Sequence, residues 1–144
     1  MKPGRIITRD PEIQSLLKTT RAIAILGVSP KPERDSHWVA KYLKDHGYRI
    51  IPVRPAQKEI LGEKAYRSLD DINEPVDMVN VFRNSSQMVP RAHEAIRLKP
   101  KVFWMQLNIE NREAADLLTA AGIDVVMDKC IKVEHERLCN ENGL

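Results

Sequence analysis

The sequence is poor in the features that define several classes of protein. It has only two cysteines, Cys130 and Cys139, too few for a disulfide framework and without the C-x-x-C spacing of a zinc or redox site. Its apolar runs, such as residues 22–28, fall far short of the roughly 20 residues that a membrane-spanning helix needs. The first ten residues lack the apolar segment of a secretory signal. These absences predict free thiols and a cytoplasmic protein without a membrane span.

Blocks of charge of one sign are also missing. The chain has 23 Lys and Arg against 20 Asp and Glu, a formal net charge of +3, with the two signs interspersed. This mild excess suits an anionic small ligand but lacks the concentrated basic stripe of a nucleic-acid-binding protein. With 42% hydrophobic residues among 144, the chain is large enough to bury a core. We expect one domain, 1–144, with an ordered core over about 10–138.

The order of apolar segments predicts an α/β domain. Continuous apolar runs with the length of strands buried on both faces lie at residues 22–26, 48–53, 77–82, 101–105 and 124–127. Helical patterns lie at residues 11–18, 36–46, 86–98, 111–121 and 132–140. Strands that alternate with helices form parallel sheets through right-handed crossovers. The sequence therefore predicts a doubly wound parallel sheet of about five strands with helices on both faces.

The expected order of the five strands is 3-2-1-4-5. Ligands of doubly wound sheets bind at the carboxyl ends of the strands, at the point where the order reverses. This order places the crevice between the first and fourth strands. The intervening residues 54–75 are irregular, with a short strand near Ile60 and Leu61 and a helical turn over 68–72.

The loop after the first predicted strand, residues 27–36, suits a phosphate. Gly27 permits close backbone approach, and amides and hydroxyls, including that of Ser36 as a possible N-cap, open the next helix. Lys31 and Arg34 could add charge-assisted hydrogen bonds. An ordinary turn with solvated charges is the alternative.

The second predicted strand ends on a cation. NAD-binding domains place an acidic residue there for the ribose 2′-hydroxyl, whereas this chain has Arg54, followed by Pro55 and Lys58. The preceding turn also lacks two glycines of the G-x-G-x-x-G pattern, with Ser29 and Pro32 in their places. Arg54 and Lys58 favour a phosphorylated ribose, as in NADP or coenzyme A. Two surface cations beside a proline turn are the alternative.

Groups able to line a ligand channel follow the third and fourth strands. Phe82 and Arg83 could contact an adenine or pantetheine group and an anion, although Phe82 fits the core equally well. Gln106 could orient a ligand amide. Trp104, inside its strand, is expected to pack in the core.

Catalytic groups are sparse. His37, His46 and His93 fall on predicted helices, where a histidine is commonly solvated or half-buried. His135 could activate the thiolate of Cys130, but no third orienting group is evident, and structural roles for both are the alternative. No His, Cys and Asp cluster has metal-ligand spacing. We assign no catalytic and no metal-ligating residues.

Taken in order, these segments resemble a known family. The segments that carry the resemblance are residues 25–29, 36, 39–43, 47–48, 51–55, 60–62, 66–69, 76–79, 81–83, 104–106 and 128–130, with His135. Their order and spacing are similar to those of the single-domain CoA-binding proteins, which are related to the N-terminal domain of the succinyl-CoA synthetase α subunit. The resemblance covers nearly the whole chain.

The resemblance implies a Rossmann-like domain that holds the ADP part of coenzyme A on the first turn and at the end of the second strand. Carried over by position, the implied contacts are Gly27, Val28 and Ser29 for the pyrophosphate and Val53, Pro55 and Lys58 for the adenosine side. The chain departs from the family at Arg54, where Asn is usual, and at Asn108, where Gly is usual. The first departure could strengthen or sterically alter phosphate contact, and the second could change the shape of the fourth loop.

The function expected from the sequence is binding of coenzyme A or an acyl-CoA, without evident catalysis. The synthetase's phosphohistidine domain has no counterpart in 144 residues, so ligase activity is not implied. The expected partner is a small-molecule CoA ligand, with neither nucleic acid nor membrane, and the sequence names no protein partner. The alternatives are an NADP-dependent oxidoreductase and a ligand-sensing subunit of another protein.

Overall fold

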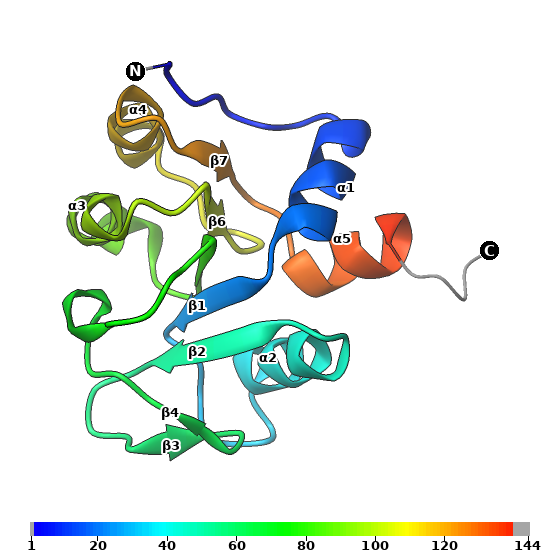
Figure 1. The fold of residues 1–144 in the computed structure, drawn as a ribbon, viewed down its shortest axis with the longest axis vertical. Helices are drawn as coiled ribbons and strands as arrows, with labels where there is room; N and C mark the ends of the chain where they lie inside the picture. The colour runs from blue at the N-terminus through cyan, green and yellow to red at the C-terminus, as the bar shows by residue number, and fades with distance from the viewer. Residues whose placement is uncertain (1, 140–144) are drawn as a thin grey trace.

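A five-stranded parallel sheet lies between two layers of helices in the computed structural model, which describes residues 2–139 (Figure 1). The sheet consists of β1 (Ala22–Leu26), β2 (Arg49–Val53), β5 (Met78–Val81), β6 (Val102–Met105) and β7 (Asp124–Val126). The helices are α1 (Asp10–Thr19), α2 (Asp35–Asp45), α3 (Met88–Leu98), α4 (Arg112–Ala120) and α5 (Ile131–Leu138). The shorter elements are an antiparallel hairpin, β3 (Glu59–Ile60) with β4 (Glu63–Lys64), and the 3-10 turns η1 (Leu69–Asp71) and η2 (Ser85–Gln87). The predicted α/β fold class is confirmed.

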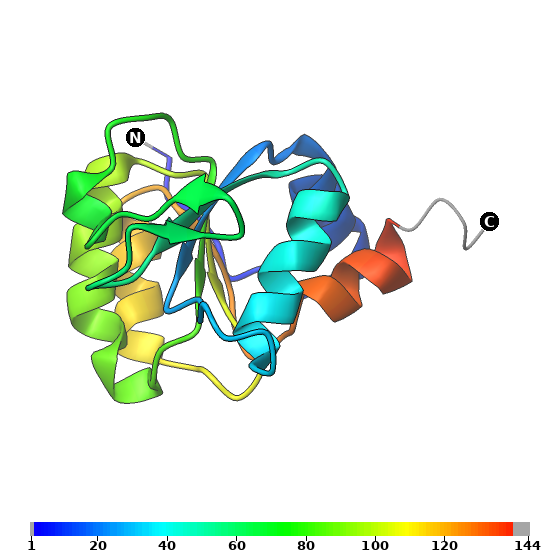
Figure 2. The same ribbon diagram turned by 90° about the horizontal axis from the view of Figure 1, so that it is seen from below.

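Apolar side chains on both faces of the sheet hold the layers together. Helices α1, α2 and α5 cover one face, where Ile23, Ile25 and Trp104 are buried, and α3 and α4 cover the other (Figure 2). Successive residues of a strand point to opposite faces, so the neighbours Phe103 and Trp104, both fully buried, belong to different cores. Burial on both faces explains why these strands appear in the sequence as continuous apolar runs.

The strand order is β2-β1-β5-β6-β7, or 2-1-3-4-5 in terms of the predicted strands, so the expected order 3-2-1-4-5 is wrong. The outer edge of β2 is already occupied, because Tyr66 forms a parallel bridge with Val53 and donates its N–H to the Pro52 carbonyl. The third strand, β5, pairs with β1 instead. There the Asp77 carboxylate accepts hydrogen bonds from two backbone N–H groups at the start of β1. The order therefore reverses between β1 and β5, and the crevice lies there.

The other edge of the sheet is covered by the segment that precedes α1. Ile6 forms a parallel bridge with Val125 of β7, and Ile7 donates its N–H to the Val125 carbonyl at 2.8 Å. Exposed strand edges offer unpaired backbone groups to other chains. This pairing covers part of the β7 edge, and the Tyr66 bridge covers part of the β2 edge.

The helices lie where the sequence predicts, but their first residues differ. Arg34 is the N-cap residue of α2, so Ser36 lies in the first turn and not at the cap. Ser85 and Ser86 lie in η2, which precedes α3. The predicted end of the last helix at Asn140 lies outside the described residues. Within residues 2–139, no helix has the length and hydropathy needed to cross a membrane.

Candidate functional site

The cationic pocket lies at the reversal point of the sheet. It has a volume of about 670 Å³ and is lined by the loop after β1, within residues 27–36, and by Arg54, Gln57, Phe82 and Arg83, which follow β2 and β5. These elements converge because the carboxyl ends of parallel strands share one edge of the sheet. The structure thus brings together the first loop and the ends of the second and third predicted strands, whereas the sequence placed the crevice between the first and fourth strands.

Two further pockets adjoin the cationic pocket. The apolar pocket, of about 610 Å³, is lined by α2, by residues 82–84 and 106–109, and by the start of α5, and it shares Asp35, Phe82 and Arg83 with the cationic pocket. The hairpin pocket, of about 550 Å³, is lined by residues 55–58, 64–65 and 67, and it shares Gln57 with the cationic pocket. The three pockets form one continuous row.

Gly27 allows the ends of β1 and β5 to approach each other. Its φ is +88°, and a Cβ at this position would lie 2.7 Å from the Phe82 carbonyl oxygen. The Phe82 N–H in turn donates to the Leu26 carbonyl at 2.8 Å. Glycine at position 27 therefore lets the end of β1 lie close to the backbone of Phe82. Gly27 also lines the cationic pocket.

Hydroxyl groups fix the loop after β1. The Ser29 N–H donates to Ser36 Oγ at 2.9 Å, and the Lys31 N–H donates to Ser29 Oγ at 3.1 Å. His37 Nδ1 lies 2.9 Å from the Ser29 carbonyl oxygen, so His37 in the tautomer with a proton on Nδ1 donates to this loop. Sequence reasoning missed this role of His37. The signal was its position in the first turn of the helix that follows the loop.

Positive charge is concentrated in the cationic pocket. Its lining includes Lys31, Arg34, Arg54 and Arg83, and none of these four makes an ion pair within residues 2–139. Burial lowers the pKa of Arg83 below its ordinary value, and the neighbouring charges of Arg54 and Arg91 lower it further. The guanidinium groups thus repel one another, and an anion placed between them would relieve this repulsion.

Apart from Gln106, which lines the apolar pocket, the predicted binding residues divide into three groups. Those that line the cationic pocket are Gly27, Ser29, Arg34, Ser36, Arg54, Phe82 and Arg83. Pro55 and Lys58 line the hairpin pocket. Val28 and Val53 have fully buried side chains that line none of the three pockets. Their carbonyl oxygens accept hydrogen bonds, from Arg54 Nη1 at 3.3 Å and from the Gly27 N–H at 3.1 Å respectively.

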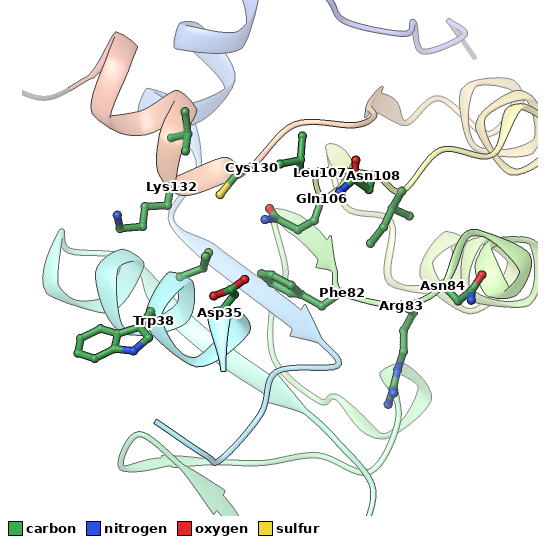
Figure 3. Close-up of a pocket in the computed structure, with 13 residues that line it drawn as sticks. Asp35, Trp38, Phe82, Arg83, Asn84, Gln106, Leu107, Asn108, Cys130 and Lys132 are labelled. Carbon is green, nitrogen blue, oxygen red and sulfur yellow. The ribbon is translucent and has the colours of Figure 1, made fainter. Parts of the chain in front are cut away.

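Gln106 is held by two hydrogen bonds at the base of the apolar pocket. It is 5% exposed, and its Oε1 accepts from Asn80 Nδ2 at 2.9 Å and from the Ile131 N–H at 3.0 Å. The amide end of Gln106 is directed towards the space between Phe82 and Cys130 (Figure 3). Asn80 Oδ1 is buried without a hydrogen-bond partner in the described part of the chain. Sequence reasoning missed Asn80, whose polar side chain in an apolar strand was the available signal.

The proposed pairing of Cys130 with His135 is not seen. Cys130 lines the apolar pocket, whereas His135 lines a separate pocket and its Nδ1 lies 2.7 Å from the Tyr42 hydroxyl. Among the described residues, no hydrogen bond joins these two side chains, and Cys130 is a free thiol. Over residues 2–139, no group of three or more His, Cys, Asp and Glu side chains is placed to hold a metal ion.

The fold and the site define a Rossmann-like α/β domain with a cation-lined crevice at the reversal point of its sheet. The sequence model of the family described as CoA binding domain matches residues 21–136. The chain belongs to this CoA binding domain family, and the resemblance expected from the sequence is confirmed.

Individual relatives agree with this family. The chain is 46% identical over 124 residues to the uncharacterized protein YneT of Bacillus subtilis, covering 86% of this chain and 92% of that protein. A solved structure of a hypothetical protein from Pyrococcus horikoshii matches with a TM-score of 0.89 and 39% identity, covering 97% of this chain and 100% of that chain. The chain is also 37% identical over 91 residues to the ADP-forming acetate–CoA ligase II subunit alpha of Pyrococcus furiosus. That match covers 62% of this chain but only 16% of the ligase subunit.

Proposed function

We propose that this protein binds coenzyme A along the row of pockets at the carboxyl edge of the sheet. The observation that carries the proposal is the cluster of Lys31, Arg34, Arg54 and Arg83, which has no ion-pair partner among residues 2–139 and lines one pocket at the reversal point. Only two acidic side chains, Glu33 and Asp35, line the same pocket. Coenzyme A carries a pyrophosphate and a 3′-phosphate, and such a polyanion matches this concentration of charge.

The pyrophosphate fits best at the start of α2. Over residues 2–139, the N-cap residue Arg34 makes no side-chain cap hydrogen bond to this helix, and the helix dipole favours an anion here. Arg34 and Arg83 both line this pocket and could donate to the phosphate oxygens.

The 3′-phosphate and adenosine are assigned to the side of the site that follows β2. Arg54 lines the cationic pocket, and Pro55 and Lys58 line the adjoining hairpin pocket together with Lys64 and Arg67. The pantetheine arm would then extend in the other direction, past Phe82 into the apolar pocket. This direction keeps the four cations of the cationic pocket beside the phosphates.

A thermal-shift panel with coenzyme A, dephospho-CoA, NADP and NAD tests the proposal. A ligand that binds only the native state raises the midpoint of unfolding, so coenzyme A should produce the largest shift and NAD the smallest. NADP shares the ribose phosphate, and a shift with NADP equal to that with coenzyme A would favour the oxidoreductase alternative. Equal shifts with coenzyme A and NAD would contradict the proposal.

An Arg112→Ala variant provides the matched control for charge. Arg112 lies at the start of α4, on the opposite face of the sheet from α2, and pairs with Asp116 at 3.4 Å. Removing this cation should leave the coenzyme A shift unchanged, whereas Arg83→Ala should reduce it. Equal reductions would mean that net charge, and not the pocket, attracts the ligand.

A further inference from the structure

The exposed apolar side chains of this protein gather in one place. Trp38, Leu107 and Val133 are 54%, 57% and 51% exposed and are the large hydrophobic residues left exposed within residues 2–139. They come from α2, from the loop after β6 and from α5, yet all three line the apolar pocket. Single exposed hydrophobic residues are ordinary, but a concave cluster contributed by separate elements marks a binding surface.

The apolar pocket continues the proposed phosphate site. Asp35, Phe82 and Arg83 line both it and the cationic pocket, so one elongated ligand can occupy both. In Figure 3 the Arg83 side chain extends away from Gln106 and Cys130, which leaves its charge on the phosphate side. The end of a coenzyme A molecule that lies farthest from its phosphates is the thiol, where an acyl group is attached. This end would enter the apolar pocket.

A hydrogen-bond donor stands at the base of this pocket. The two hydrogen bonds to Gln106 Oε1 fix the orientation of the side-chain amide, and its Nε2 is left to face the pocket. An amide N–H held in this way can donate to a thioester carbonyl or to an amide of the pantetheine arm. The surrounding apolar side chains would then cover the rest of the acyl chain.

The charges of the pocket disfavour an anionic acyl group. Lys132 is directed to other partners, because its Nζ lies 3.2 Å from Glu136 and 5.3 Å from the centre of the Tyr42 ring. The Asp35 carboxylate lies on the pocket wall and would repel a second carboxylate. Arg83 also lines this pocket, but its side chain extends away from Gln106 and Cys130 (Figure 3), so Asp35 is the charged group that faces the acyl position.

We propose that the apolar pocket is the subsite for an uncharged aliphatic acyl group, so that the ligand is an aliphatic acyl-CoA. This inference rests on the proposed binding of coenzyme A. It predicts that succinyl-CoA is not the preferred ligand, although the resemblance includes the succinyl-CoA synthetase α subunit.

Calorimetric titration with coenzyme A and with acetyl-, butyryl-, hexanoyl- and succinyl-CoA tests the inference. A fully buried methylene improves affinity by about fourfold, so even partial burial should make hexanoyl-CoA bind about tenfold or more tightly than acetyl-CoA. Butyryl- and succinyl-CoA have acyl chains of equal length, and butyryl-CoA should bind at least about fivefold more tightly because of Asp35. Equal affinities for coenzyme A and all its thioesters would overturn the acyl subsite and leave coenzyme A binding intact. Failure of every ligand to bind would overturn both proposals.

Substitutions at Leu107 test whether the acyl chain that raises the affinity lies in the apolar pocket. Leu107→Ser should abolish most of the gain in affinity with chain length, measured within the variant as the ratio of hexanoyl-CoA to coenzyme A affinity, because Leu107 is exposed and lines the apolar pocket. Leu107→Met keeps an apolar wall and should preserve the gain. If affinity rises with acyl chain length as steeply in Leu107→Ser as in wild type, the acyl chain lies elsewhere and the inference is overturned.

Alkylation of Cys130 gives a second readout in the unmodified chain. Hexanoyl-CoA should slow the reaction of Cys130 with iodoacetamide more than coenzyme A does, because the acyl chain would cover the pocket that this thiol lines. Cys139, which lines a different pocket, serves as the internal reference when the labelled peptides are quantified by mass spectrometry. Equal protection of Cys130 by the two ligands would contradict the proposed position of the acyl chain.

Discussion

The side chains of Asn80 and Gln106 meet in the interior, where Asn80 Nδ2 donates to Gln106 Oε1 at 2.9 Å. The same oxygen accepts the Ile131 N–H at 3.0 Å, so one amide joins β5, the loop after β6 and the start of α5. This arrangement connects the fold to the site, because Gln106 also lines the apolar pocket.

Replacement of Gln106 by Leu should destabilise the protein by about 2–4 kcal/mol. The variant leaves two buried donors, Asn80 Nδ2 and the Ile131 N–H, without their acceptor, and each unsatisfied group costs about 1–3 kcal/mol. Urea denaturation of wild type and variant measures the difference. Adding Asn80→Leu to this variant should restore part of the loss, since it removes one of the unsatisfied groups. A single variant within about 0.5 kcal/mol of wild type would show that these hydrogen bonds contribute little.

Glycine at position 27 should be needed for folding as well as for access to the pocket. A Cβ there would lie 2.7 Å from the Phe82 carbonyl oxygen, in addition to the strain of a φ of +88°. Gly47, after α2, has a similar φ of +94°, but a Cβ at that position would meet no atom within 4 Å. Gly27→Ala should therefore lower the free energy of unfolding more than Gly47→Ala, which carries only the backbone strain of about 1–2 kcal/mol. Equal losses in denaturant titrations would show that the backbone near Phe82 can move away.

Arg54→Ala should weaken coenzyme A binding by about 1.5–3 kcal/mol, the usual range for a hydrogen bond between charged groups, if Arg54 contacts the 3′-phosphate. Dephospho-CoA lacks that phosphate, so its affinity should change little. Calorimetric titration of both ligands against both proteins separates the contact from any change in the loop, where Arg54 Nη1 also donates to the Val28 carbonyl. Equal losses of affinity for the two ligands would show that Arg54 holds the loop or contacts the pyrophosphate. No loss for either ligand would show that Arg54 is a solvated surface charge.

Stability should fall in mild acid because of His135. Burial lowers the pKa of His135 below its ordinary value of 6.5, the nearby His46 lowers it further, and Glu136 opposes the shift. The folded protein thus holds His135 neutral where the unfolded chain would protonate it. Its contribution to stability is present above pH 6.5 and is lost as the pH falls through the lower pKa of the folded state. The Tyr42 hydroxyl contacts His135 Nδ1, and burial raises the pKa of Tyr42 to about 12, so this hydroxyl stays protonated throughout.

Urea denaturation between pH 7.5 and pH 5 measures this dependence. His135→Gln should flatten the profile, whereas His93→Gln, a substitution at an exposed residue of α3, should leave it as in wild type. An unchanged slope in His135→Gln would assign the acid sensitivity to other groups.

The helices and strands could be predicted from the sequence because each carries a local pattern of apolar residues, periodic in the helices and continuous in the buried strands. Strands such as β1 are apolar on both faces, and the first loop carries its cations next to Gly27 in the sequence. The strand order could not be predicted in this way, since it depends on Tyr66 pairing with the edge of β2. That bridge is a tertiary contact without a distinct signal in the sequence.

The apolar part of the site was harder to predict than the cationic part. Trp38, Leu107 and Val133 are far apart in the chain, and only the packing of α2 and α5 on one face of the sheet brings them to one pocket. In the sequence each is an ordinary hydrophobic residue. Asn80 and Gln106, likewise, are separated by 26 residues, and their hydrogen bond follows from the pairing of β5 with β6.

A crystal structure of the protein with coenzyme A tests the central claim most directly. We expect phosphate groups within hydrogen-bond distance of the first N–H groups of α2 and of Arg54 or Arg83, with the thiol end in the apolar pocket near Gln106. Coenzyme A bound outside this row of pockets, or bound with its thiol end towards Lys58, would contradict the proposed binding mode.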